Sequence, residues 1–252
     1  MKSIDINCDL GESFGHYHLG NDKEILKHIS SANIACGFHA GDPLVIKNTI
    51  EAALSEGVSL GAHPGFPDLN GFGRRVMKLT DDELYSCVLY QVSVLKSMAE
   101  ALGGTLKHVK PHGAMYNMAA IDVKMALVIA RAIQQVDDQL MLVGLANSEM
   151  IKAAQMIDLP VCNEVFADRR YTDNGFLVPR SHDGAVIHDE AVCVQQVRDM
   201  LFNNEVTSIN GKQVAIKADT ICIHGDNAEA LQFAKKLNAS LADEDIIVSS
   251  IN

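Results

Sequence analysis

The segment "ANIACGFHAGDPLVIKNTIEAALSEGVSLGAHP", residues 32–64, contains the unit from which this chain is built. It opens with a short apolar run, 32–38, which is typical of a buried strand. The next stretch, 42–57, predicts a helix that Asp42 caps at its amino terminus. A second apolar run, 58–64, predicts another strand. The order strand, helix, strand predicts a parallel sheet.

The same unit recurs along the whole chain. We expect strands over 4–10, 32–38, 58–64, 105–113, 140–146, 159–169 and 218–226, and helices over 21–31, 42–57, 80–104, 122–136, 148–157, 189–203 and 228–241. The strands are apolar through their middles, as expected when both faces of a sheet are buried. Seven such repeats predict an α/β fold, either a barrel or a doubly wound sheet. The length of 252 residues favours one domain, 1–252.

Composition narrows the class of protein. The formal charge is −11 and no Lys/Arg cluster occurs, which argues against nucleic acid as a partner. The six cysteines form no CxxC pair and several lie in apolar runs, so we interpret them as reduced thiols of a cytoplasmic protein. No signal peptide is visible, and no apolar run reaches the ~18 residues of a membrane span.

Two nucleotide-binding patterns are missing from the sequence. "GESFGHYHLG" at 11–20 follows the first predicted strand but is not the G-x-G-x-x-G of a dinucleotide-binding sheet. The phosphate-binding pattern G-x-x-x-x-G-K-[ST] does not occur. The sequence therefore does not predict a site of either kind on this chain.

Polar residues follow six of the seven predicted strands at the point where each strand ends. In chain order these groups are Asn7, Asp9 and Glu12; His39 and Asp42; His63 and Asp68; Lys110 and His112; Glu164, Asp168, Arg169 and Arg170; and His224 and Asp226. The carboxyl ends of parallel strands face one side of the fold. We therefore expect a shared pocket there, although Asp42 and Asp226 could equally serve as helix caps.

Two long connections flank this expected pocket. "GFPDLNGFGRR" at 65–75 could close over a substrate, with Arg74 or Arg75 binding a carboxylate. Residues 166–187 form a second connection, longer than most, which favours a binding loop. A plain surface connection is the alternative for both.

Two kinds of chemistry explain this set of side chains. Asp9, His39 and His63 could bind a divalent metal that activates water, although neither HExxH nor HxH occurs. Alternatively, a carboxylate acts as general base while Lys110 or a protonated histidine stabilises an oxyanion. Both hypotheses indicate hydrolysis or opening of a carbonyl compound.

Six motifs extend the interpretation from chemistry to a family. They are "NCDLGESFG" (7–15), "NIACGFHAGDP" (33–43), "GAHPGFPDLNGFGRR" (61–75), "HVKPHGAMYN" (108–117), "EVFADRRYTDNGFLVPR" (164–180) and "ICIHGDN" (221–227). In this order they resemble the LamB/YcsF family from about residue 4 to about residue 240.

The resemblance implies both a fold and an activity. The fold is a distorted seven-stranded (β/α) barrel of the glycoside hydrolase/deacetylase type. The activity is that of one subunit of an ATP-dependent 5-oxoprolinase, which opens 5-oxoproline (pyroglutamate) to L-glutamate together with two partner subunits, PxpB and PxpC. Deacetylase relatives hold a metal on an Asp-His-His set, and the motifs leave open whether Asp9, His39 and His63 do so here.

Within that activity we can assign roles as hypotheses. The partner subunits would bind ATP, and this chain would admit water to the activated lactam. Asp9 or Glu12 would be the base, Lys110 and His112 would stabilise charge, and Arg74, Arg75 or Arg169 would bind the substrate carboxylate. Asn7, His39, His63, Glu164 and His224 would complete the substrate site.

Two rival functions remain open at this point. A self-sufficient metal-dependent amidase or deacetylase would bind metal tightly and work without ATP or partners. A binding scaffold would present 5-oxoproline to an active site on another protein of the complex, so that changes in the pocket would alter affinity only. A homo-oligomer is compatible with either function.

Overall fold

Seven parallel strands close into a barrel in the computed structural model, which describes residues 2–223 and 228–251. Their order is β1-β2-β3-β4-β5-β6-β9, and β9 pairs back with β1 to close the ring. This confirms the predicted α/β fold and its seven-stranded barrel. The strands of the ring are β1 (Lys2–Leu10), β2 (Ser31–Ala35), β3 (Ser59–His63), β4 (Leu106–Val109), β5 (Met141–Leu145), β6 (Val161–Phe166) and β9 (Thr220–Ile223).

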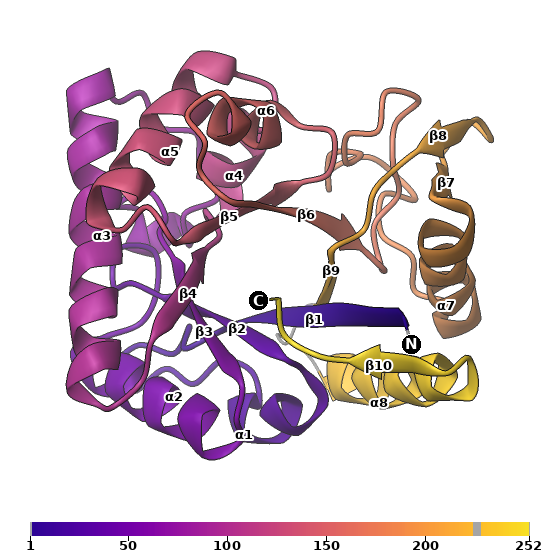
Figure 1. Cartoon of the computed structure of the whole chain (residues 1–252), viewed down its shortest axis with the longest axis horizontal. Coiled ribbons are helices and arrows are strands. Elements are labelled where there is room, and N and C mark those ends of the chain that lie inside the picture. The colour runs from indigo at the N-terminus through magenta and orange to yellow at the C-terminus, as the bar shows by residue number, and fades with distance from the viewer. Residues whose placement is uncertain (1, 224–227, 252) are drawn as a thin grey trace.

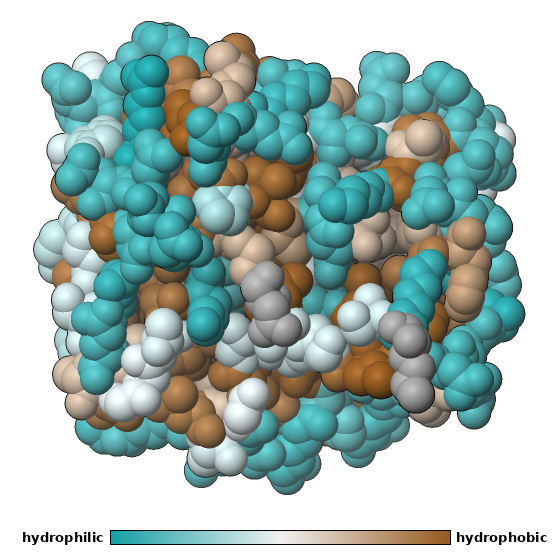
Figure 2. All heavy atoms as spheres, in the orientation of Figure 1, coloured by the Kyte–Doolittle hydropathy of each residue, from teal (hydrophilic) through white to brown (hydrophobic). Residues whose placement is uncertain are grey.

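Helices surround this ring of strands, and Figure 1 looks along the barrel axis. They are α1 (Asp22–Ile25), α2 (Pro43–Ser55), α3 (Asp81–Ala101), α4 (Gly113–Ala119), α5 (Val123–Val136), α6 (Glu149–Gln155), α7 (Glu190–Arg198) and α8 (Ala228–Asp243). Short 3-10 turns lie at Leu26–His28 and Leu69–Gly71, and a π-helical turn, Asp199–Asn203, follows α7. In the same view, Figure 2 shows hydrophilic side chains over much of the periphery.

The cap expected at Asp42 is present in the structure, and a second cap begins α3. The Asp42 carboxylate accepts hydrogen bonds from the N–H groups of Leu44 and Val45 and so caps α2. Thr80 and Glu83 form a capping box at the start of α3. Because such caps satisfy amide groups that have no partner inside the helix, they fix where each helix begins.

The helix predicted over 21–31 is much shorter in the structure. α1 ends at Ile25 and a 3-10 turn follows, because the N–H of Ser30 already donates to the carbonyl of Ile6 at 2.9 Å. The chain therefore enters the sheet, beside β1, before another helical turn can form.

Four elements, one helix and three strands, were not predicted from the sequence. The strand expected over 105–113 ends at Val109, and α4 begins at Gly113, whose φ of 53° breaks the extended run. A hairpin of β7 (Glu205–Thr207) and β8 (Gln213–Ala215) precedes β9. A final strand, β10 (Ile246–Val248), pairs with the first residues of β1.

The core has an inner part in the barrel and an outer part under the helices. Ile50 of α2, Val88 of α3 and Ile129 of α5 are fully buried in the outer part. Each such side chain contributes roughly 1.5–3 kcal/mol through burial. Among the described residues, no single helix is long and apolar enough to cross a bilayer, and one bent pair, α4 with α5, reaches that length and composition only when both helices are counted together.

Candidate active site at the carboxyl ends of the strands

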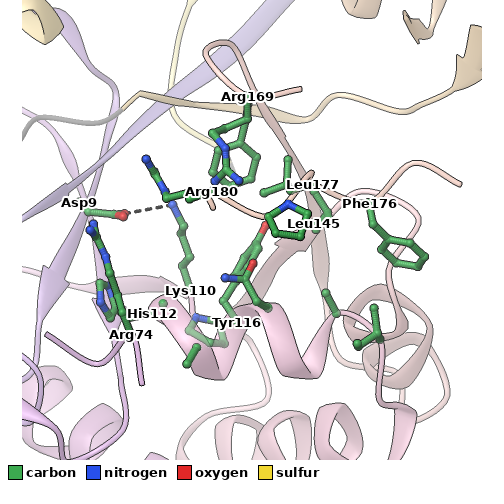
Figure 3. A pocket seen from close by; sticks show the side chains of 18 of the residues that line it. Asp9, Arg74, Lys110, His112, Tyr116, Leu145, Arg169, Phe176, Leu177 and Arg180 are labelled. Carbon is green, nitrogen blue, oxygen red and sulfur yellow. Dashed lines mark hydrogen bonds and ion pairs between the residues drawn. The ribbon is translucent and has the colours of Figure 1, made fainter. Parts of the chain in front are cut away.

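A cavity of about 500 Å³ lies at the carboxyl ends of the barrel strands. Figure 3 shows Asp9, Arg74 and His112 on one side and Leu145, Phe176 and Leu177 on the other, with Lys110 and Tyr116 between them. One side of the cavity is thus ionic and the other apolar. Such a cavity suits a small ligand with a charged end.

Lys110, just after β4, is the electrostatic centre of the ionic side. Its buried ammonium lies 3.0 Å from Asp9 Oδ1, 2.7 Å from Glu164 Oε1 and 3.2 Å from the Cys222 thiol. Burial acts to lower the pKa of Lys110, but the charges of Asp9 and Glu164 hold it well above its usual range. Lys110 is therefore a fixed cation and not a base.

Tyr116 and Glu164 extend this centre toward the apolar side. The Tyr116 hydroxyl donates to Glu164 Oε2 at 2.6 Å, and burial followed by the charge of Glu164 raises the pKa of Tyr116 well above its usual value. Glu164 is fully buried between Tyr116 and Lys110. It therefore compensates part of the lysine charge and fixes the lysine position.

A cluster of three histidines lies next to Asp9. The rings of His39 and His112 stack with centroids 3.8 Å apart, and His63 stands edge-on to both. Burial, and then the neighbouring histidines, lower the pKa of His39 well below its usual range and that of His112 to about 3. Among the described residues, neither ring nitrogen of His39 has a hydrogen-bond partner.

The hydrogen bonds of His63 and His112 leave one ring nitrogen of each facing the other. His63 Nδ1 lies 2.6 Å from the Lys110 carbonyl, and His112 Nε2 lies 2.8 Å from the Phe72 carbonyl. A carbonyl only accepts, so each of these nitrogens carries a proton. The pKa of His112 is about 3, so its ring is neutral and its Nδ1 is an unprotonated acceptor. His63 Nε2 lies 3.0 Å from that lone pair, and a divalent cation held by both nitrogens would take the place of a proton there.

The donor set of this cluster fits a divalent metal. Glu12, His39, His63 and His112 can each offer one ligand atom, and these atoms lie within 4.8 Å of one another. Two nitrogens bound to one tetrahedral metal lie roughly 3.3 Å apart, close to the separation of His63 and His112. The stacked, parallel rings of His39 and His112 cannot both point their lone pairs at one ion without moving. His63, His112 and Glu12 are therefore the best-placed ligands.

Of the three metal ligands expected from the sequence, two lie in the histidine cluster and one does not. His39 and His63 belong to this cluster, whereas Asp9 is not part of that mutually close group. Asp9 Oδ1 instead bonds Lys110, although its Oδ2 lies 3.3 Å from His63 Nε2. The cluster thus replaces Asp9 with Glu12 and adds His112.

Arginines supply further positive charge to the cavity. Arg169 is buried and donates to the Val178 carbonyl at 2.6 Å. Burial, and then the nearby charge of Arg180, lower the pKa of Arg169 to about 10, so it stays charged at neutral pH. Arg74 lies over the Phe72 ring on the ionic side. These guanidinium groups suit an anionic ligand.

Half of the residues expected from the sequence line this cavity. Those that do are Asp9, His63, Arg74, Lys110, His112 and Arg169, whereas Asn7, Glu12, His39, Arg75 and Glu164 do not line it. Arg75 instead forms an ion pair with Asp68, and its side chain is 67% exposed. His224 and Asp226 lie outside the described residues.

Sequence reasoning missed other residues of the site. Tyr116 reaches the cavity because α4 begins at Gly113 and places it one turn beyond His112. The only signal was the proline at 111, which argues against a continuing strand. Arg180 and Phe176 come from the long connection after β6, whose length alone indicated a binding role.

The fold and site together define a class: a parallel (β/α) barrel with an acid, a fixed lysine and a histidine cluster at its strand ends, as suits hydrolysis of a carbonyl compound. The sequence matches the LamB/YcsF family model over residues 4–252. The chain belongs to the LamB/YcsF family.

Known proteins resemble this chain both in sequence and in structure. The chain is 53% identical over 251 residues to the A subunit of 5-oxoprolinase from Geobacillus thermodenitrificans, covering 100% of this chain and 98% of that one. It superposes on a lactam utilization protein from Thermus thermophilus with a TM-score of 0.94, at 41% identity and full coverage of both chains. A family 4 carbohydrate esterase from Streptomyces lividans shares the fold alone, with a TM-score of 0.52, 13% identity and coverage of 100% and 93%.

Proposed function

We propose that this chain, as a single barrel domain, is the A subunit of an ATP-dependent 5-oxoprolinase and opens 5-oxoproline to L-glutamate with PxpB and PxpC. The observation that carries the proposal is the partly buried ion pair of Asp9 and Lys110 in a cavity flanked by arginines. The similarity to the A subunits of 5-oxoprolinases over the whole chain supports the substrate.

The reaction needs chemical activation before water can act. A five-membered lactam is an unactivated amide, and phosphorylation of its carbonyl oxygen would make the ring carbon electrophilic. We assign ATP binding and this phosphorylation to the partner subunits. The cavity of this chain receives the activated lactam, since its apolar side accommodates the ring and its ionic side the charged groups.

Individual side chains then have defined tasks. Asp9 or Glu12 takes the proton of the attacking water, while Lys110 stabilises the negative charge that develops. His112 was expected to share that task, but its ring is neutral and its N–H donates to the Phe72 carbonyl. Arg74 or Arg169 binds the substrate carboxylate. Arg75 has no such task, because it is engaged by Asp68 away from the cavity.

A divalent metal has a place in this proposal. His63, His112 and Glu12 would hold it, with His39 adjacent. When bound, it would polarise the carbonyl group of the substrate.

The free cysteines, five of them buried, suit the cytoplasm as the compartment.

Glutamate release from 5-oxoproline tests the proposal directly. The metal content of the purified chain is measured first, and release is then followed with the chain alone and with PxpB, PxpC and ATP. We expect release only in the complete mixture. Release by the chain alone, or none in either case, would contradict the assignment.

One observation favours a second candidate, a self-sufficient metal-dependent amidase. The His/Glu cluster can bind a metal without any other protein. This candidate predicts lactam or amide hydrolysis by the isolated chain, in proportion to its metal content and independent of ATP.

A further inference from the structure

Two buried side chains beneath the cavity have no role in the reaction as described so far. Asn33 on β2 and His108 on β4 are both fully buried. They lie in a polar network inside the barrel that reaches Asp9 and Lys110.

The orientation of the Asn33 amide follows from its neighbours. Its Nδ2 lies 2.9 Å from Asp9 Oδ1 and 2.7 Å from Asn7 Oδ1. An ionised carboxylate only accepts hydrogen bonds, so the amide nitrogen must face Asp9. Both N–H groups of Asn33 are then used, and its Oδ1 points the opposite way.

His108 holds the amide in that orientation. Its Nε2 lies 2.8 Å from Asn33 Oδ1 and must carry the proton, because an amide oxygen only accepts. Burial, and then the charge of Lys110, lower the pKa of His108 to about 3, so the ring is neutral with a single N–H. Gly61 gives this ring its space, since a Cβ there would lie 2.0 Å from Nε2.

Asn33 and Lys110 converge on the same oxygen of Asp9. Lys110 Nζ and Asn33 Nδ2 lie 3.0 and 2.9 Å from Oδ1. Two donors on one oxygen fix the rotation of the carboxylate and place Oδ2 on the side of His63, at 3.3 Å. Asp9 lines the cavity, whereas Glu12 does not.

We propose that Asn33 and His108 are positioning residues that hold Asp9 Oδ2 toward the substrate, which makes Asp9, and not Glu12, the general base. As the water oxygen bonds to the activated ring carbon, one of its protons passes to Asp9 Oδ2. When the ring C–N bond breaks, that proton is returned to the nitrogen, and the second water proton follows it as the carbonyl group re-forms. The product of this step is the acyl phosphate, which a second water cleaves to L-glutamate and phosphate. This inference rests on the proposed function.

The experiment measures kcat and KM for glutamate release by the complete enzyme, per folded molecule, for four variants of this chain. Asn33→Leu removes the donor to Asp9 at similar volume, and His108→Leu removes the group that orients Asn33. We expect kcat to fall roughly tenfold to a hundredfold in both, with KM changed less than about threefold. His108→Gln can still donate from the position of Nε2, and we expect its kcat within about threefold of wild type.

Asn163→Leu is the matched control. Asn163 is a buried asparagine that donates to a carboxylate, Asp219, at 2.6 Å, but it does not line the cavity. We expect a lower melting temperature without a loss of kcat. If Asn33→Leu does not fold, the kcat values of His108→Leu and His108→Gln still test the positioning role.

Different outcomes would overturn different claims. Unchanged kcat in His108→Leu, or an equal loss in His108→Gln, would show a structural role only and would overturn the positioning role. Absence of glutamate release from wild-type complete enzyme would instead overturn the proposed function.

Discussion

Two polar clusters lie side by side in this barrel, and they differ in how well their atoms are satisfied. In the inner network, Asn7 and Asn33 use their side-chain amides in hydrogen bonds to neighbours, and Lys110 has acceptors around it. Among the described residues of that network, His108 Nδ1 is buried without a hydrogen-bond partner. In the histidine cluster, two ring nitrogens face each other and His39 has no hydrogen-bond partner among the described residues.

The difference separates a rigid support from a site that accepts a ligand. A largely paired buried network fixes one geometry, whereas several unpaired buried nitrogens in one cluster cost free energy unless something binds them. The inner network is therefore expected to respond to substitution through stability and orientation. The histidine cluster is expected to respond to added cations.

The largest effect is expected at Lys110, which belongs to the inner network and also borders the cavity. Lys110→Met leaves Asp9 and Glu164 without their cation. We expect a loss of about 3–5 kcal/mol in the free energy of unfolding and roughly a hundredfold to a thousandfold fall in turnover. Urea denaturation and glutamate release measure these. Lys96→Met, which removes a partly exposed ion pair with Glu100, is the control and should change neither markedly.

Added metal should distinguish the two clusters next. At a Zn²⁺ concentration about a hundredfold above Kd, binding stabilises the folded chain by about 2.7 kcal/mol. We expect a higher melting temperature for wild type and no change for His63→Ala, which lacks one facing nitrogen. His108→Gln, altered in the inner network only, should respond as wild type does. An equal response of all three would contradict a metal site at the histidine cluster.

Gly61→Ala tests how tightly the inner network is packed. The added Cβ would lie 2.0 Å from His108 Nε2, because the ring reaches from β4 across Gly61 on β3 to Asn33 on β2. We expect a loss of about 1–3 kcal/mol from overpacking. The double variant Gly61→Ala/His108→Ala should lose less than the sum of the two single variants, because the ring that clashes is gone. Additive losses in thermal denaturation would place the strain elsewhere.

Acid should weaken the inner network through His108. Its pKa of about 3 in the folded chain lies below the ordinary 6.5, so the folded state favours the neutral ring. That stability is complete above about pH 6.5 and is lost as the pH falls toward 3, by up to about 1.4 kcal/mol per pH unit. His108→Gln should flatten this part of the profile measured by urea denaturation at several pH values. The exposed His18→Gln is the control with the same loss of a histidine.

The sequence predicted the barrel because its signals are local. Apolar runs repeat with each βα unit, caps such as Asp42 and Thr80 begin some of the helices, and the structure places strands and helices there. α1 and α4 were misjudged for tertiary reasons. Pairing of Ser30 with Ile6 shortens the first, and the turn at Gly113 starts the second inside an expected strand.

The site was predicted less completely than the fold. Strand-end position correctly brought together Asp9, His63, Lys110 and His112. It could not show that Arg75 would pair with Asp68. Nor could it show that Asn33 would donate to Asp9, or that His108 would bond to Asn33 inside the barrel. Those facts depend on which way each side chain leaves its strand or loop, and residue type alone does not determine that direction.

The smallest effect is expected outside both clusters, at two adjacent arginines that the sequence could not tell apart. Arg74 lines the cavity, and Arg75 pairs with Asp68. We expect Arg74→Ala to raise the KM for 5-oxoproline roughly tenfold with a smaller change in kcat, because one charged contact to the substrate carboxylate is lost. Arg75→Ala should leave both constants within about twofold. If the two variants behaved alike, the substrate carboxylate would have to be bound elsewhere, and Arg169, a buried arginine of the cavity, would be the next to replace.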